Sequence, residues 1–310
     1  MKIAVIGTGA MGSIFGSMLS SVSDIYLVTT NKDHVKAINE KGLKVEKNDG
    51  TFKRYKLLAT SDPNTISVKV DLAIIFTKSY NTRDAAISAV PMLKQDGLAL
   101  TLQNGLGNYD VISDVLGKNR AVAGVTSHGG TLVSPGHVRH AGTGHTEFSG
   151  PGADSEKIVR IAEIFNAAGI DTSISDDLDS LLWGKLIINV GINALTAILK
   201  VQNGILYTTP ECEKIMKKAV VEAVEIANAL KINIPYDDPF EQVKKVCENT
   251  AQNRASMLQD ILSGSRTEIG VINMAVVAKG IEAGIPAPYN LFLSEIIEAL
   301  EATAESNIFK

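Results

Sequence analysis

The segment KIAVIGTGAMG, residues 2–12, places the pattern G-x-G-x-x-G directly after a run of β-branched and apolar residues. That run predicts a buried strand, and the residues after the glycines predict a helix. In this context Gly7 permits a tight turn, Gly9 lets the backbone approach a pyrophosphate, and Gly12 lets the helix pack closely on the strand. The free N–H groups of the helix N-terminus then attract phosphates. We expect the motif to bind a dinucleotide, with a plain glycine-rich turn as the alternative.

Outward from this motif, the first half of the chain alternates between apolar runs and helical patterns. The expected strands cover residues 25–29, 71–76, 98–102, 121–127, 136–148 and 170–174, and the expected helices cover 32–41, 82–93 and 155–168. A hairpin turn is expected at Asn48-Asp49-Gly50. Such alternation predicts a mainly parallel, doubly wound α/β sheet of the Rossmann type.

The pattern changes near residues 175–177, and from Leu178 onward only helical periodicity remains. Glycine and proline breakers divide this part into expected helices at residues 178–200, 210–230, 238–262, 265–283 and 288–305. We therefore expect a dinucleotide-binding Rossmann-type domain over residues 1–175 and an all-helical substrate and catalytic domain over 176–310. The cleft between such domains is the default place for a ligand.

The composition excludes several classes of protein. The 310 residues contain 30 Lys and Arg against 34 Asp and Glu, a net charge of −4 without a basic stripe, which argues against nucleic-acid binding. No stretch approaches the ~20 apolar residues that a membrane span needs, so no membrane partner is expected. The two cysteines lack ligand or disulfide spacing and favour a cytoplasmic protein. Four of the five histidines lie between His128 and His145 without a metal-binding motif, so no metal is expected.

The end of the second strand bears on the choice of dinucleotide. NAD sites usually place a carboxylate there, about 20 residues after the glycines, to hold the ribose hydroxyls. This chain has Asn31 and Lys32 at that position, and Asp33 comes late. Amide and ammonium groups suit a 2′-phosphate, although Lys32 lacks the fork of an arginine. NADP(H) is therefore favoured, and NAD(H) stays open.

A polar stripe interrupts the apolar run LLWGKLIINVGINALTAILK, residues 181–200. Lys185, Asn189 and Asn193 are spaced i, i+4, i+8 and so share one helix face. Burying an ammonium and two amides costs on the order of several kcal/mol unless each of these groups finds a hydrogen-bond partner. The stripe therefore indicates a functional site. The alternative is an ordinary solvated face.

A second polar face is expected at Asn253, Ser256 and Asp260, spaced i, i+3, i+7, and Glu268 follows at the start of the next expected helix. Helix capping and dipole pairing are the alternatives for Ser256 and Glu268. Lys78 and Asn104 each follow a strand of the expected sheet, where ligands bind in this fold class, although loop roles would explain both.

These motifs together resemble the ketopantoate reductase (2-dehydropantoate 2-reductase) family over nearly the whole chain. The matching segments are GTGAMG at 7–12, TKSY at 77–80, QNGLGN at 103–108, LWGKLIINVGINALTA at 182–197, QNGIL at 202–206, NRASMLQDI at 253–261 and RTEI at 266–269. The lysine–asparagine helix and the SMLQD and TEI pair are specific together, whereas the glycine motif adds little. The resemblance implies a helical C-terminal domain like that of 6-phosphogluconate dehydrogenase.

The resemblance also implies roles for individual residues. Lys185 matches the general acid, and Glu268 matches a carboxylate beside the cofactor that helps to order the site. The residues that match substrate contacts are Asn104, Lys185, Asn189, Asn193, Asn203, Asn253 and Ser256. The residues expected at the cofactor are Gly7, Thr8, Gly9, Ala10, Met11, Gly12, Asn31, Lys32, Lys78, Asn104, Gly129 and Glu268. The family usually has an arginine where Asn31 stands, which is a departure at the 2′-phosphate position.

The expected reaction is NADPH-dependent reduction of 2-dehydropantoate to (R)-pantoate, a step of pantothenate and coenzyme A biosynthesis, in which Lys185 protonates the carbonyl oxygen. The expected partner is a small 2-oxo acid, and a homodimer is left open. Three alternatives remain: a related oxoacid, hydroxyacid or imine reductase, since fold does not fix substrate; a non-catalytic NADP-binding redox sensor; and a Schiff-base role for Lys185.

Overall fold

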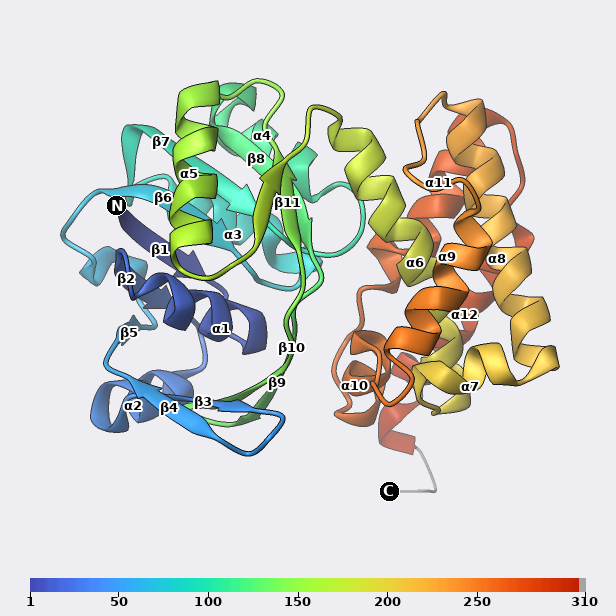
Figure 1. The fold of residues 1–310 in the computed structure, drawn as a ribbon, viewed down its shortest axis with the longest axis horizontal. Helices are drawn as coiled ribbons and strands as arrows, with labels where there is room; N and C mark the ends of the chain where they lie inside the picture. Colours follow the sequence, from blue (N-terminus) through green and yellow to red (C-terminus); the bar gives the residue numbers. More distant parts are fainter. Residues whose placement is uncertain (307–310) are drawn as a thin grey trace. The chain divides into compact units, whose positions relative to one another are not determined.

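The computed structural model describes residues 1–306 and divides by contacts into two compact units. The N-terminal unit comprises Met1–Gln103 and Gly107–Leu178, and the helical unit comprises Asn104–Leu106 and Asp179–Lys310. The two units are described separately below, with element labels as in Figure 1. The three-residue turn Asn104–Leu106, which the sequence alone places in the first domain, groups with the helical unit.

The N-terminal unit contains an eight-stranded sheet in the order β12-β11-β8-β7-β6-β1-β2-β5. Its strands are β1 (Lys2–Ile6), β2 (Asp24–Val28), β5 (Leu58–Thr60), β6 (Val70–Ile75), β7 (Leu93–Thr101), β8 (Ala121–Thr126), β11 (Thr146–Ser149) and β12 (Thr172–Ile174). Every neighbouring pair is parallel except β8 with β11. The strand order reverses between β1 and β6, which is where ligands bind in sheets of this type. The expected Rossmann-type fold is confirmed.

Helices cover both faces of this sheet because successive strand residues point to opposite sides. Ile3 and Val5 pack with α1 (Ala10–Leu19), α2 (Lys32–Lys41) and α5 (Ser155–Ala167) in one core. Ala4 and Ile6 pack with α3 (Thr82–Ala89) and α4 (Asn108–Leu116) in another. Near-continuous apolar strands such as KIAVI are what a sheet buried on both faces requires.

A second sheet of four strands, in the order β4-β3-β10-β9, was not expected as a separate element. Its strands are β3 (Leu43–Lys47), β4 (Phe52–Tyr55), β9 (Gly129–Ser134) and β10 (His137–Gly142). The antiparallel pairing of β3 with β4 confirms the hairpin at residues 48–50. The single strand expected at 136–148 is wrong, because the chain leaves β10 and enters the other sheet as β11. A register shift between His140 and Gly142 marks the change.

The helical unit contains no strand within its described residues, which end at residue 306. Its helices are α6 (Leu178–Leu199), α7 (Asn203–Thr208), α8 (Pro210–Ala229), α9 (Pro239–Asn249), α10 (Ser256–Leu262), α11 (Asn273–Ala283) and α12 (Pro288–Ala302). Helix α6 is central: a Cβ at Gly191 would lie 2.8 Å from the Val243 side chain of α9 and 3.0 Å from that of Val220 in α8. The expected all-helical part is confirmed.

Two of the expected helices differ in the structure. The expected helix at 238–262 breaks into α9 and α10, because the carbonyls of Ala251 and Asn253 accept the N–H groups of Gly204 and Asn203 at the start of α7. Carbonyls used in this way cannot also continue a helix. The expected helix at 265–283 begins only at Asn273, after a 3₁₀ turn over Ile269–Val271.

Helix α6 is also the one described helix that is long and apolar enough to cross a membrane, with a mean hydropathy of 1.5 over its most apolar window. However, 78% of that window is buried inside the protein. A mostly buried apolar helix is the pattern of a core helix, as in a soluble protein.

Candidate active site

The glycine motif forms a tight turn between β1 and α1. Gly7 has a φ of +89°, and a Cβ there would lie 2.3 Å from the backbone nitrogen of Thr77, at the end of β6. Its N–H donates to the Val28 carbonyl at 2.9 Å, and the Thr8 hydroxyl donates to the same carbonyl at 3.0 Å. The turn therefore joins the ends of β1, β2 and β6, and only glycine fits at its first position.

The next glycine of the motif faces open space. A Cβ at Gly9 would meet no atom within 4 Å, whereas one at Gly12 would lie 2.6 Å from the Gly7 carbonyl oxygen. Helix α1 begins at Ala10 with no side-chain cap and no acidic residue in its first turn. Its N-terminal dipole and N–H groups are thus available for an anion, and these residues fit a dinucleotide pyrophosphate.

At the tip of β2, Asn31 caps helix α2. Its Oδ1 accepts the His34 N–H at 2.9 Å, and Lys32 is exposed as the first residue of the helix. His34 itself is fully buried, with Nε2 3.1 Å from the Ser13 hydroxyl and Nδ1 accepting the Gly136 N–H at 2.9 Å. Burial lowers the pKa of His34 and favours its neutral ring. His34 therefore ties α1 to α2, a role for which the sequence offers no signal.

Lys78 follows β6 and is half-buried, directly before a 3₁₀ turn over Ser79–Asn81. The preceding carbonyl, of Thr77, accepts the Gln103 amide at 2.6 Å, and Gln103 also accepts the Thr101 hydroxyl at 2.7 Å. Gln103 thus joins the ends of β6 and β7, which sequence reasoning missed. Gly129, also expected at the cofactor, is the first residue of β9 and is half-buried.

The polar stripe of α6 lies inside the helical unit. Asn189 and Asn193 are only 7% and 5% exposed, so the solvated-face alternative does not describe them. Lys185 is half-buried, and the side chains of Trp183 and Leu186, which are near it in the sequence, are buried. Burial lowers the pKa of the Lys185 ammonium. An ammonium with a lowered pKa releases its proton more readily, as a general acid must.

Asn104 belongs with this stripe. The Asn189 Nδ2 lies 3.4 Å from the Asn104 Oδ1, and the turn after Asn104 packs on Val271. There the Leu106 N–H donates to the Val271 carbonyl at 2.9 Å, and a Cβ at Gly105 would lie 2.3 Å from the same oxygen. Gly105 also has a φ of +85°, so only glycine allows this approach.

Glu268 directly precedes the 3₁₀ turn over Ile269–Val271 and is 8% exposed. Its carbonyl accepts the Val271 N–H at 3.1 Å. It does not start a helix as the sequence suggested. Through Val271, the structure brings the segment that contains Glu268 together with Asn104 and Asn189. The helical unit thus collects three of the expected site residues from three separate parts of the sequence.

The remaining candidates lie around the α9–α10 loop. Asn203 is buried; its N–H donates to the Asn253 carbonyl at 3.1 Å, and its Nδ2 donates to the Thr250 hydroxyl at 2.9 Å. Asn253 and Ser256 are exposed, and Asn253 lies before α10. The expected common helix face of Asn253, Ser256 and Asp260 is therefore wrong. Ala255 occupies the N-cap position, so the capping alternative for Ser256 is not observed.

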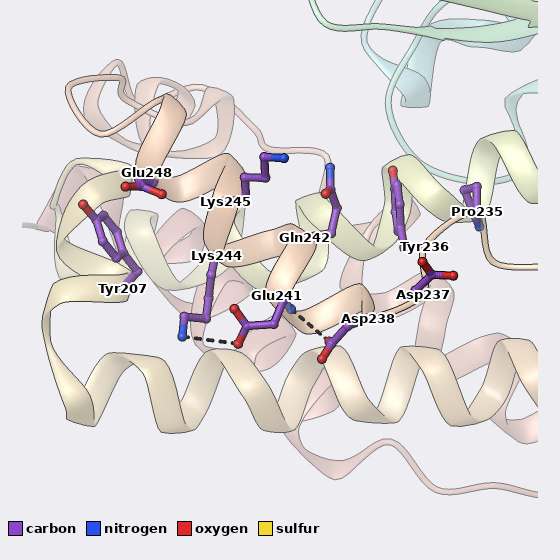
Figure 2. Close-up of a pocket in the computed structure, with 10 residues that line it drawn as sticks. All are labelled: Tyr207, Pro235, Tyr236, Asp237, Asp238, Glu241, Gln242, Lys244, Lys245 and Glu248. Atoms are coloured by element: carbon purple, nitrogen blue, oxygen red, sulfur yellow. Dashed lines mark hydrogen bonds and ion pairs between the residues drawn. The ribbon is translucent and has the colours of Figure 1, made fainter.

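Two further groups of polar side chains are present, and the first is a histidine pair whose His128 directly precedes Gly129 in the sequence. His128 and His140 approach to 2.9 Å between ring nitrogens, and burial, followed by the neighbouring His140, lowers the pKa of His128 to about 4. A cavity of about 610 Å³ in the helical unit is lined mainly by charged side chains of the α9 region (Figure 2). Its Lys244 pairs with Glu241 at 3.4 Å, and no expected site residue lines it.

Comparison with known proteins matches both halves of the chain to one family. The model described as ketopantoate reductase PanE/ApbA matches residues 3–152, and the model of the C-terminal part of the same family matches residues 177–301. The chain is 33% identical to the 2-dehydropantoate 2-reductase of Halobacterium salinarum, over 96% of this chain and 98% of that one.

Solved structures agree. A PanE/ApbA family ketopantoate reductase from Ralstonia eutropha superposes with a TM-score of 0.90 at 32% identity, covering 98% of this chain and 100% of that one. A D-mandelate dehydrogenase, solved with NADH and anilino(oxo)acetate, has the same TM-score of 0.90 at 30% identity, covering 98% of this chain and 100% of that one.

Proposed function

This chain belongs to the ketopantoate reductase family, a family of oxidoreductases, and we propose that it reduces 2-dehydropantoate to (R)-pantoate with NADPH. The observation that carries the proposal is the half-buried Lys185 on the face of α6 that also bears Asn189 and Asn193. An enzyme of this family is favoured over a non-catalytic redox sensor, which would need neither the lysine nor the amides.

The proposed chemistry needs a cation and acid at the substrate carbonyl. When bound, NADPH would supply the hydride that adds to C2 of the oxo acid. Lys185 stabilises the negative charge that develops on the carbonyl oxygen and gives it a proton from Nζ. The pKa of Lys185, lowered by burial, makes that proton easier to release.

The amides hold the reacting groups in place. Asn189 and Asn104, 3.4 Å apart, form one pair, and Asn193 lies one turn further along α6. Their carbonyl and amide groups can orient both the ammonium and the oxo acid. We place the substrate carboxylate at the exposed Ser256 hydroxyl, with Asn203 and Asn253 in support, and Glu268 at the nicotinamide side of the cofactor.

The cofactor assignment rests on the N-terminal unit. Residues Gly7 to Gly12 would hold the pyrophosphate, with Lys78 and the backbone at Gly129 as further contacts. The exposed Lys32 ammonium would attract a 2′-phosphate, and no carboxylate stands at the end of β2 to repel it. NADPH is therefore preferred to NADH in this proposal.

The biological setting follows from the reaction. We place the enzyme in pantothenate and coenzyme A biosynthesis, in the cytoplasm. Cys212 and Cys247 are buried and unlinked, and burial raises the pKa of Cys247 to about 12, so both behave as inert core thiols. A measurement of the mass of the protein in solution distinguishes a monomer from a homodimer.

The test is a matrix of initial rates. 2-Dehydropantoate and phenylglyoxylate, the oxo acid that corresponds to mandelate, are each assayed with NADPH and with NADH. The proposal predicts the highest kcat/KM for 2-dehydropantoate with NADPH. A higher kcat/KM for phenylglyoxylate contradicts the substrate, and a higher value with NADH contradicts the cofactor, independently of each other.

A further inference from the structure

A chain of buried polar side chains crosses the core of the helical unit. Glu222 of α8 accepts the Tyr289 N–H at 2.8 Å and the Asn290 N–H at 3.0 Å, so its carboxylate caps the start of α12. The Asn290 Nδ2 donates to Glu222 at 2.8 Å, and the Asn290 Oδ1 accepts the Asn273 Nδ2 at 3.0 Å. Asn273 and Asn290 are both 0% exposed.

The far end of this chain reaches the helix that carries Lys185. The Asn273 Nδ2 also lies 3.4 Å from the Val190 carbonyl oxygen of α6, and Val190 directly follows Asn189. In the other direction along the sequence, Asn273 is two residues after Val271, whose carbonyl holds the turn that carries Asn104. Asn273 is therefore hydrogen-bonded to the helix that carries Asn189, and it is close in the sequence to Val271, which holds the turn of Asn104.

The energetics of Asn273 argue that stability alone does not account for it. Its Oδ1 is buried and has no hydrogen-bond partner within residues 1–306, which is a cost of about 1–3 kcal/mol for a buried polar atom. An apolar side chain of similar shape would avoid that cost, and buried polar groups are often neutral or unfavourable compared with such a replacement. What the amide adds is direction: it fixes the position of the start of α11 relative to α6.

We propose that Asn273 is a positioning residue, which keeps Asn104 and Asn189 at hydrogen-bond distance by fixing the segment 268–273 against α6. The inference rests on the proposed reduction of a 2-oxo acid, because that reaction is what the Asn104–Asn189 pair would serve. Asn273 touches neither residue of the pair in this scheme. It acts through Val190 on one side and through Val271 on the other.

The test compares Asn273→Ala with Ser294→Ala. Ser294 is also 0% exposed, and its hydroxyl donates only to the Asn290 carbonyl within α12, so this control removes a buried polar group without touching segment 268–273. Two quantities are measured in both variants and in the wild type: kcat for 2-dehydropantoate, and hydrogen exchange of the Leu106 amide, which the Val271 carbonyl protects. Asn273→Ser, which keeps a shorter donor, replaces the alanine variant if that one does not fold.

We expect Asn273→Ala to lower kcat by about tenfold or more, the effect of a small misplacement of catalytic groups, and to speed exchange at Leu106. Ser294→Ala should change neither, even with a similar loss in Tm. Wild-type exchange at Leu106 in Asn273→Ala overturns the inference, as does a kcat equal to that of Ser294→Ala. If the wild type does not reduce 2-dehydropantoate, the proposed function fails, and Leu106 exchange alone still decides on positioning.

Discussion

The side-chain amide of Asn189 lies 3.4 Å from the side-chain oxygen of Asn104, although 85 residues separate them in the sequence. The contact is made inside the helical unit, because the turn Asn104–Leu106 leaves the sheet and docks on Val271. A residue that follows a strand of the Rossmann-type sheet is thereby delivered to the helix that carries Lys185.

Replacement of the lysine tests the acid directly. Lys185→Ala should lower kcat by about 10²–10⁴-fold, the usual contribution of acid–base catalysis, while NADPH binding is retained. Steady-state rates and a cofactor titration measure the two effects. Lys279→Ala is the matched control, since Lys279 is a half-buried lysine of the same unit that pairs with Glu282 at 2.8 Å. Near wild-type turnover in Lys185→Ala would exclude it as the acid.

The pH dependence of the reaction should show the same group. The acid must be protonated, so kcat should fall as pH rises through the pKa of Lys185, which burial sets below the ordinary 10.5. The unfolded chain keeps the ordinary pKa and binds more protons between the two values, so the free energy of unfolding should rise with pH in that window. A pH–rate profile measures the first effect, and Lys185→Ala should lose this alkaline limb. An unchanged limb in the variant would assign it to another group.

The docked turn can be tested with a pair of glycines. Gly105→Ala combines a φ of +85° with a Cβ 2.3 Å from the Val271 oxygen, so the turn must shift and carry Asn104 away from Asn189. Gly107→Ala has a similar φ of +89°, but its Cβ would meet nothing within 4 Å. Each should lose about 1–3 kcal/mol of stability from backbone strain, and Gly105→Ala should lose more because of the added collision. Only Gly105→Ala should also lose kcat. If the two variants have equal kcat values at matched Tm, the position of the turn does not contribute to catalysis.

The phosphate-binding turn offers the opposite contrast. Gly9→Ala places a methyl group in space that no protein atom occupies within 4 Å, so the fold and Tm should change little. The same methyl group would stand where the pyrophosphate is expected, and NADPH affinity should fall by about tenfold or more, about 1.4 kcal/mol. Fluorescence titration measures the affinity. Gly7→Ala, which would collide with Thr77, should instead lower Tm. Undiminished NADPH binding by Gly9→Ala would contradict the assignment of the turn.

The features that the sequence predicts correctly are those that depend on neighbours in the chain. The glycine turn follows from residues 2–12 alone, and the shared face of Lys185, Asn189 and Asn193 follows from helical spacing. The presence of a Rossmann-type half and of a helical half follows from the change in periodicity near Leu178. Each of these signals is local, and each survives in the structure.

What could not be predicted depends on partners far away in the sequence. The break between α9 and α10 arises because the start of α7 takes the carbonyls of Ala251 and Asn253. The late start of α11 accompanies the bond from Leu106 to Val271. The roles of His34 and Asn273 are invisible without the groups packed against them, because a single buried histidine or asparagine has no pattern of its own.

Because residues 104–106 belong to the helical unit, they constrain how the halves of two relatives can be combined in one protein. A hybrid made by joining the first 178 residues of one relative to the helices of another would leave this turn facing a foreign counterpart of Val271. Exchange of the helical half should therefore succeed only when these three residues are exchanged together with it. The boundary between the two units thus lies at two places in the gene rather than one.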